Sequence, residues 1–237
     1  GWDFPLFAHK AVGDWQIVHG INLRCHHLSL YAMEGQAKRD YPASISYQSP
    51  WFRSYRVVED YFARVNAALS EGEELRDLLV VHPVESTWIH RALPGMPFSE
   101  QDEENDRLVR VRNILLGANL DFDYGDEALL VRHARVEAGP ALRVGRATYR
   151  CVLLPRLRTI RGTTLALLRD FVAAGGRVVY VEEIPSRVDG CESSEAAEAY
   201  RAFTPAAESE SADVLSPWVR ELSIRAGGHE VGTLLHR

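Results

Sequence analysis

Three short apolar runs in this sequence end in residues that can transfer protons or bind polar ligands. The residues that follow the runs are His82, Glu85 and Ser86, then Arg156, then Glu182 and Glu183. If the runs are parallel strands, their carboxyl ends meet at one sheet edge, where ligands of α/β proteins bind. A histidine and several carboxylates at that edge could perform general acid–base catalysis. The alternative is a set of ordinary polar loop residues, which any such sheet places at its strand ends.

A second candidate site is the segment from His26 to Pro42, a long loop rich in charge. Its neighbourhood also holds aromatic side chains, among them Trp51. Aromatic rings stack on the apolar face of a sugar while charged side chains bind its hydroxyl groups, so this composition suits a carbohydrate. The alternative is a salt-bridged loop that clamps two domains together. The candidate substrate-binding residues are His26, His27, Glu34, Lys38, Arg39, Asp40, Trp51 and His82.

No metal site or cofactor is expected. His26 and His27 are adjacent, and neighbouring residues of a strand point to opposite faces. Cys25, Cys151 and Cys191 are too scattered for a metal-ligand spacing or a disulfide framework. Neither the Gly-x-Gly-x-x-Gly pattern nor the Walker pattern of phosphate-binding loops occurs. Gly175-Gly176 is explained as the end of a helix.

The elements that would position these residues alternate between helix and strand from about residue 50 to residue 182. Apolar spacing predicts helices over 50–69, 106–116 and 163–174, the first with Ser49 as N-cap and Pro50 at its first position. Continuous apolar runs predict buried strands within 77–83, 149–155 and 177–181. Weaker patterns suggest short strands at 21–26 and 128–131. The alternation indicates βαβ units and an α/β fold with a doubly wound, flavodoxin-like parallel sheet.

The bulk composition excludes several classes of protein. The chain has 237 residues, of which 46% are hydrophobic and 25% charged, as expected for a soluble globular protein. Its net charge is −6, and the arginines at 107, 110 and 112 stand beside an acidic run that compensates them. We therefore expect no nucleic-acid partner. No apolar run approaches the roughly 18 residues of a membrane span, so no membrane partner is expected either.

A free-standing hydrolase of the class I glutamine-amidotransferase type is disfavoured. That chemistry requires a cysteine on a tight turn between a strand and a helix, flanked by small residues. Here the strand at 177–181 leads into Glu182-Glu183-Ile184, and Cys151 lies inside a strand run. We expect Cys151 to be a small core residue.

The sequence resembles parts of large glycoside hydrolases. Four segments resemble the last strand of a catalytic barrel and the loop that follows it. They are Asp14-Trp15, His19-Gly20-Ile21-Asn22, His26-His27 and Glu34-Gly35-x-x-Lys38-Arg39-Asp40-Tyr41-Pro42. Residues 122–130, 145–155 and 171–179 are similar to the domain that follows the barrel in family 106 α-L-rhamnosidases. Family 42 β-galactosidases have a comparable amidotransferase-like domain in that position.

The resemblance implies that this chain is an interior fragment. Residues 1–48 would end a (β/α)8 barrel, residues 49–228 would form the α/β domain, and residues 229–237 would start a following segment. Gly1 stands where a natural chain begins with Met, which fits a processed or truncated protein, either cytoplasmic or secreted and bacterial. The implied partners are a carbohydrate and the missing part of the barrel. A homo-oligomer is also expected, because apolar surfaces normally covered in the parent would be exposed.

Catalysis by such a parent needs two carboxylates that flank the glycosidic bond. In a barrel they stand at the carboxyl ends of different strands, and this chain contains at most one or two of the eight strands. At least one of the pair therefore lies outside it, and Glu34 and Asp40 are candidates for substrate contacts. The leading hypothesis is a glycoside hydrolase fragment with a non-catalytic α/β module. The alternatives are a structural or oligomerising module without activity and, third, the amidotransferase-like hydrolase.

Overall fold

The computed structural model describes residues 3–26, 29–36, 45–71, 76–92, 98–219, 225–226 and 229–230. These residues fall into two compact units, one up to Glu71 and the other from Arg76 onward, here called the helical unit and the α/β unit. The helix at 56–70 packs within the helical unit. No helix in the described part of the chain combines the length and apolar character that crossing a membrane requires.

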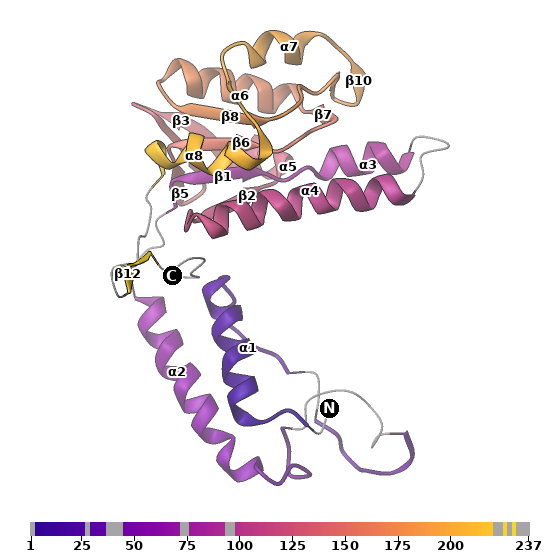
Figure 1. Ribbon diagram of the computed structural model, residues 1–237, viewed down its shortest axis with the longest axis vertical. Helices are drawn as coiled ribbons and strands as arrows, with labels where there is room; N and C mark the ends of the chain where they lie inside the picture. Colours follow the sequence, from indigo (N-terminus) through magenta and orange to yellow (C-terminus); the bar gives the residue numbers. More distant parts are fainter. Residues whose placement is uncertain are drawn as a thin grey trace. The chain divides into compact units, whose positions relative to one another are not determined.

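The helical unit consists mainly of α1 (Leu6–Val18) and α2 (Arg56–Ser70), which pack side by side (Figure 1). Ile17 of α1 and Val58 and Phe62 of α2 form its buried core. The apolar residues of α2 recur at intervals of three and four, which places them on one face of the helix. Helix α1 is absent from the sequence prediction, and residues 21–26 are not the short strand expected there.

Helix α2 begins later than predicted. A 3-10 turn, η2 (Phe52–Ser54), precedes it, and the α-helix starts at Arg56 rather than near Pro50. Ser49 does not cap the helix, since its buried hydroxyl has no hydrogen-bond partner in the described part of the chain. Apolar spacing is similar in a 3-10 turn and in a first α-helical turn, so periodicity does not separate the two.

The α/β unit is built on a five-stranded parallel sheet in the order β2–β1–β6–β8–β11. The strands are β1 (Leu78–Val81), β2 (Phe122–Gly125), β6 (Cys151–Leu154), β8 (Arg177–Val181) and β11 (Thr204–Ala206). The three strongest apolar runs of the sequence are therefore the three central strands, and the predicted α/β class with a parallel sheet is confirmed. All residues of β1 and β6 are buried.

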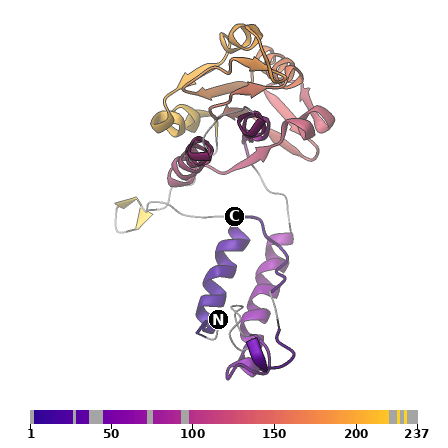
Figure 2. The same ribbon diagram turned by 90° about the vertical axis from the view of Figure 1, so that its right-hand side faces the viewer.

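Helices cover both faces of this sheet (Figures 1 and 2). On one face, Leu79 and Val152 pack with residues of α5 (Glu127–His133), α6 (Gly162–Ala173) and α7 (Glu195–Tyr200). On the other face, Leu78 and Leu153 pack with α4 (Phe98–Gly117) and α8 (Ser211–Leu215). Alternate strand residues point to opposite faces, so each central strand contributes to both cores.

Smaller elements complete the α/β unit. They are α3 (Val84–Ala92), the antiparallel sheet of β3 (Ala134–Glu137), β4 (Ala141–Val144) and β5 (Ala147–Tyr149), and the sheet of β7 (Thr159–Ile160), β9 (Arg187–Val188) and β10 (Cys191–Glu192). Two 3-10 turns, η3 (Glu208–Glu210) and η4 (Ser216–Trp218), flank α8. The short strands β12 (Arg225–Ala226) and β13 (His229–Glu230) pair with each other.

The strand predicted at 128–131 is wrong, because these residues belong to helix α5. The carboxylate of Asp126 accepts a hydrogen bond from the backbone N–H of Leu129 at 3.0 Å and caps the helix. A run of four apolar residues fits either a buried strand or a helix, and here the cap decides for the helix.

Candidate functional site

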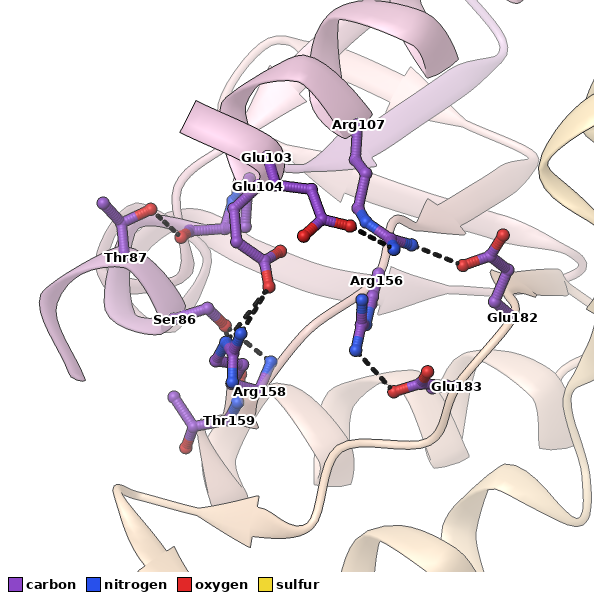
Figure 3. Close-up of polar contacts among 11 residues, drawn as sticks. Ser86, Thr87, Glu103, Glu104, Arg107, Arg156, Arg158, Thr159, Glu182 and Glu183 are labelled. Carbon is purple, nitrogen blue, oxygen red and sulfur yellow. Dashed lines mark hydrogen bonds and ion pairs between the residues drawn. The ribbon is translucent and has the colours of Figure 1, made fainter. Parts of the chain in front are cut away.

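The candidate site lies at the carboxyl ends of the central strands of the α/β unit. From β1 the chain passes to β2 on one side and then to β6 on the other, so the winding direction reverses between β1 and β6. Ligands of open α/β sheets bind in the crevice at such a switch point. Residues that the sequence places after three different strands meet at this edge, as Figure 3 shows for Ser86, Arg156, Glu182 and Glu183.

The carboxylates after β8 are held by arginines. Arg107 of α4 pairs with Glu182 at 2.7 Å and with Glu103 at 2.8 Å. Arg156, after β6, pairs with Glu183 at 2.9 Å. The hydrogen bond from Arg107 lowers the pKa of the Glu103 carboxyl. The charge of each of these carboxylates is therefore compensated by the arginine that it contacts.

Glu182 is unusual in its backbone conformation. Its φ is 61°, a left-handed value that bulky residues rarely adopt. It directly follows β8, where a strand-to-helix elbow would hold a nucleophile. Its side chain is instead a carboxylate paired with Arg107. The strained position is thus occupied by an ion-paired group that is no nucleophile for acyl transfer.

Two further links join α3 and α4 to the loop after β6. Arg158 pairs with Glu104 of α4 at 3.0 Å. The buried hydroxyl of Ser86 accepts a hydrogen bond from the backbone N–H of Arg158 at 3.0 Å and donates to the carbonyl of Thr159 at 3.3 Å. Ser86 therefore fixes the path of the loop rather than presenting a free hydroxyl (Figure 3).

Arg161 links Glu85 of α3 to the buried Glu127 of α5. Its guanidinium contacts Oε1 of Glu85 at 2.6 Å, and its backbone N–H donates to Oε2 of Glu127 at 2.8 Å. Burial raises the pKa of the Glu127 carboxyl, the direction that a glycosidase general acid requires. Only 1% of Glu127 is exposed, however, so it cannot contact a substrate and its role is structural.

We expect the buried Glu127 to make stability depend on pH. Its folded-state pKa lies above the ordinary 4.5, so its contribution is fully present below pH 4.5 and is lost as the pH rises through the folded pKa. Glu127→Gln keeps an oxygen that can accept the N–H of Arg161. Urea unfolding should show the variant gaining stability relative to the wild type between pH 4 and pH 8. A stability difference that is constant across this range would contradict the assignment.

The predicted residue His82 packs beside an aromatic ring. Its ring meets that of Tyr124 of β2 edge-to-face, with centroids 5.5 Å apart, at the carboxyl ends of β1 and β2. It belongs to the α/β unit, whereas the other predicted binding residues belong to the helical unit or lie outside the described residues.

In the helical unit, His26 joins a polar cluster that the sequence analysis did not foresee. Its Nε2 lies 2.9 Å from the hydroxyl of Tyr55 and 3.6 Å from Glu59. Burial, and then the nearby Arg24, lower the pKa of His26, which favours a neutral ring that accepts the tyrosine hydrogen. His9 of α1 packs edge-to-face on Tyr55 and is 2% exposed. His9 lies four residues before Gly13 and eight before Ile17, the other buried residues of α1, and this helical spacing was the signal available in the sequence.

The remaining predicted residues are not drawn together by contacts in the described part of the structure. Glu34 is exposed. Trp51 is half-buried, and its indole nitrogen is buried without a hydrogen-bond partner among described residues. His27, Lys38, Arg39 and Asp40 lie outside the residues that the structure describes. The sequence analysis did not predict a site role for Arg107, Arg158 and Arg161, although each pairs with a carboxylate at the sheet edge.

Cys151 is the first residue of β6 and is fully buried. Burial raises the pKa of its thiol to about 12. The thiolate is the reactive form of cysteine, so this side chain is inert.

No family model and no curated protein matches this sequence. Solved structures do match in fold. A catalytic mutant of a GH42 β-galactosidase from G. stearothermophilus matches 73% of this chain with a TM-score of 0.53 and 15% identity. A rhamnosidase from a Novosphingobium species matches 91% of it with a TM-score of 0.56 and 16% identity. The chain spans 23% and 21% of the lengths of these two proteins, so the likeness concerns a segment of each.

Proposed function

We propose that this chain is part of a glycoside hydrolase that acts on an oligosaccharide or polysaccharide, and that its α/β domain is a non-catalytic accessory module. The two similar structures are a β-galactosidase and a rhamnosidase, and in each the matching segment is less than a quarter of the protein. The domain limits that we propose are 1–48 for the end of the catalytic barrel, 49–228 for the α/β domain, which then includes α2 as well as the α/β unit, and 229–237 for the start of a following segment.

The α/β domain is proposed to be flavodoxin-like and related to the class I glutamine amidotransferases. Numbered along the chain, its five parallel strands lie in the order 2-1-3-4-5, which is the flavodoxin-like order. Cys151 is buried in a strand and Glu182 stands at the elbow position, so neither supplies the accessible cysteine nucleophile of the amidotransferases.

The observation that carries the non-catalytic role is the pairing of the carboxylates at the sheet edge. Glycoside hydrolysis needs one carboxyl group as acid and a second as base or nucleophile, both open to the substrate. Glu85, Glu182 and Glu183 each lie within 3.0 Å of an arginine nitrogen. Glu127 has a raised pKa but is buried. The catalytic pair is therefore proposed to lie in the barrel of the parent protein.

Within this chain, the proposed contacts with substrate are the hydrogen-bonding and aromatic residues singled out in the sequence. For His26, the cluster with Tyr55 and Glu59 supports this role, since it holds the imidazole in one orientation. The full proposed set is His26, His27, Glu34, Lys38, Arg39, Asp40, Trp51 and His82.

The test compares the product of the complete parent gene with the isolated 237-residue chain. Both are assayed for release of aglycone from aryl galactosides and rhamnosides and of reducing ends from a panel of plant and microbial polysaccharides. We expect the parent to hydrolyse at least one substrate and the isolated chain to hydrolyse none. In the parent, Glu182→Gln with Glu183→Gln should leave kcat within about twofold of wild type. Hydrolysis by the isolated chain, or an inactive parent, would overturn the proposal.

One observation favours the second candidate, a structural or oligomerising module. Several large apolar side chains of the helical unit are exposed, among them Phe7 at 76%, Leu23 at 81% and Tyr31 at 98%. Exposed apolar surface of this kind marks sites of association. The missing barrel would cover it in the parent, and a second copy would cover it in the isolated chain.

A further inference from the structure

A pocket of about 350 Å³ opens at the switch point of the α/β unit, beside the ion-pair network. Its walls come from α3, β7 with the start of α6, and the turn between β9 and β10. Small-molecule sites are typically concave, about 300–1,000 Å³ in volume, and common at the switch points of α/β sheets. The position and size of this pocket therefore suit a small ligand.

The apolar part of the pocket is formed by Trp88 and Ile89 of α3 and by Ile160 of β7. Ile160 is fully buried, whereas Trp88 is 61% exposed. An indole ring is large and apolar, and leaving it in water forfeits the free energy of its burial. An exposed ring in the wall of a pocket offers a flat surface on which a ligand ring can stack.

The polar part of the pocket contains an unsatisfied acceptor. Oε1 of Glu85 receives the guanidinium of Arg161, with its Nε at 2.7 Å and its second nitrogen at 2.6 Å. Oε2 of the same carboxylate is buried, and no group in the described part of the chain donates a hydrogen bond to it. Buried carboxylate oxygens are costly to leave unpaired, and a hydroxyl donor that enters the pocket beside Glu85 would satisfy this one.

The far wall is held in place by backbone hydrogen bonds. Asp189 and Gly190 form the two-residue turn between β9 and β10, with φ values of 50° and 79° as a type I′ hairpin requires. The N–H of Gly190 donates to Oγ1 of Thr159 at 3.0 Å, and the N–H of Asp189 donates to the carbonyl of Ile160 at 3.0 Å. The wall is thus preorganised, which lowers the entropic cost of binding.

The charges of the pocket select the class of ligand. Glu85 and Asp189 are two carboxylates against the single guanidinium of Arg161. A phosphate group would meet net negative charge, and no glycine-rich loop follows β1 to cradle it. A neutral ligand with several hydroxyl donors and one apolar face matches three features of the pocket. They are the exposed ring of Trp88, the unpaired oxygen of Glu85 and the excess of negative over positive charge.

We propose that this pocket binds one pyranose ring of a carbohydrate, stacked on Trp88, with hydroxyl groups donating to Glu85 and Asp189. The proposal rests on the proposed function for the class of ligand, and it assigns the α/β unit a sugar subsite apart from the catalytic carboxylates. The pocket would then hold a part of the substrate or product chain while hydrolysis proceeds in the barrel.

The test is a titration of the 237-residue chain, labelled with 15N, with methyl glycosides of galactose, glucose, mannose, xylose and rhamnose. We expect at least one to shift the indole N–H resonance of Trp88, with a dissociation constant on the order of 1 mM because one sugar ring has few contacting atoms. Trp88→Ala should weaken that binding about tenfold, the loss expected for a stacked ring. Trp15→Ala is the matched control, since Trp15 is 56% exposed and does not line the pocket.

The outcomes separate this proposal from the proposed function. If none of the five glycosides binds, or if inorganic phosphate binds and competes with them, the sugar subsite is overturned even when the parent enzyme is active. Equal losses in the Trp88 and Trp15 variants would also overturn it. If a glycoside binds through Trp88 while the parent shows no hydrolysis, the subsite stands and the proposed enzymatic function falls.

Discussion

Replacing Phe171 by alanine is expected to lower the free energy of unfolding of the α/β unit by about 3–5 kcal/mol. Phe171 is fully buried in α6 and packs in the core on one face of the sheet. The backbone of Gly176 lies against the same ring, and a Cβ atom there would come within 2.2 Å of Cε2. Gly176 has no side chain that could fill the space that the ring leaves, so we expect the cavity to persist. The loss is a large share of the about 5–15 kcal/mol that stabilises a typical domain.

Hydrogen exchange measured by mass spectrometry on peptides from β6 and β8 reports this loss for the α/β unit alone. Phe171→Leu is the conservative control and should cost less than the alanine variant, because it retains most of the apolar volume. Phe7→Ala removes a phenylalanine that is 76% exposed, and should change stability by no more than about 0.5 kcal/mol. If Phe171→Ala and Phe7→Ala had equal effects, the proposed packing of α6 would be wrong.

Gly13→Ala is expected to destabilise the helical unit by about 1–3 kcal/mol, the usual cost of overpacking. Glycine inside a helix is normally worse than alanine by about 1 kcal/mol, so the substitution would stabilise an unpacked helix. Here a Cβ on Gly13 would lie 2.0 Å from Cζ of Phe62 and 2.7 Å from a guanidinium nitrogen of Arg24. Phe62 is 4% exposed and cannot turn away freely. The steric overlap therefore outweighs the gain in helix propensity.

The decisive measurement for Gly13 is a double-mutant cycle with Phe62→Leu, followed by hydrogen exchange in peptides from α1 and α2. In the Phe62→Leu background the smaller side chain relieves the overlap, so Gly13→Ala should cost less or become stabilising. Additive effects of the two substitutions would show that α1 and α2 do not approach each other through these residues.

The central sheet could be predicted from the sequence because burial on both faces leaves a local signature. The runs that became β1, β6 and β8 are continuous and apolar, and their ends carry the polar residues that meet at the site. The carboxyl ends of parallel strands lie at one edge of the sheet, so the meeting of these polar residues at that edge followed from the fold class alone. Neither edge strand was predicted: Phe122–Gly125 is only partly buried and contains Asp123, and Thr204–Ala206 is short and contains Pro205.

Helix α1 and helix α5 show where local patterns fail. The apolar residues of α1 do not follow a single clean face, and it is fixed as a helix within the unit by its packing against Phe62 of α2. The run 128–131 carries too few residues to separate strand from helix, and the capping hydrogen bond of Asp126 settles it. In both cases the deciding contact is made by a residue outside the local apolar pattern.

The sequence by itself determined which residues are buried in the central strands and which polar residues stand at their ends. Only the tertiary structure decided what those polar residues do. The pairs Arg107–Glu182 and Arg161–Glu85 join residues that are 75 and 76 positions apart, and the pocket takes its walls from three separate segments. A hydrophobic pattern records the environment of each residue but not the identity of its distant neighbours. Charge pairing, pocket shape and the unpaired oxygen of Glu85 depend on those neighbours, because a hydrogen bond or a contact ion pair forms only between groups that lie a few ångströms apart in space.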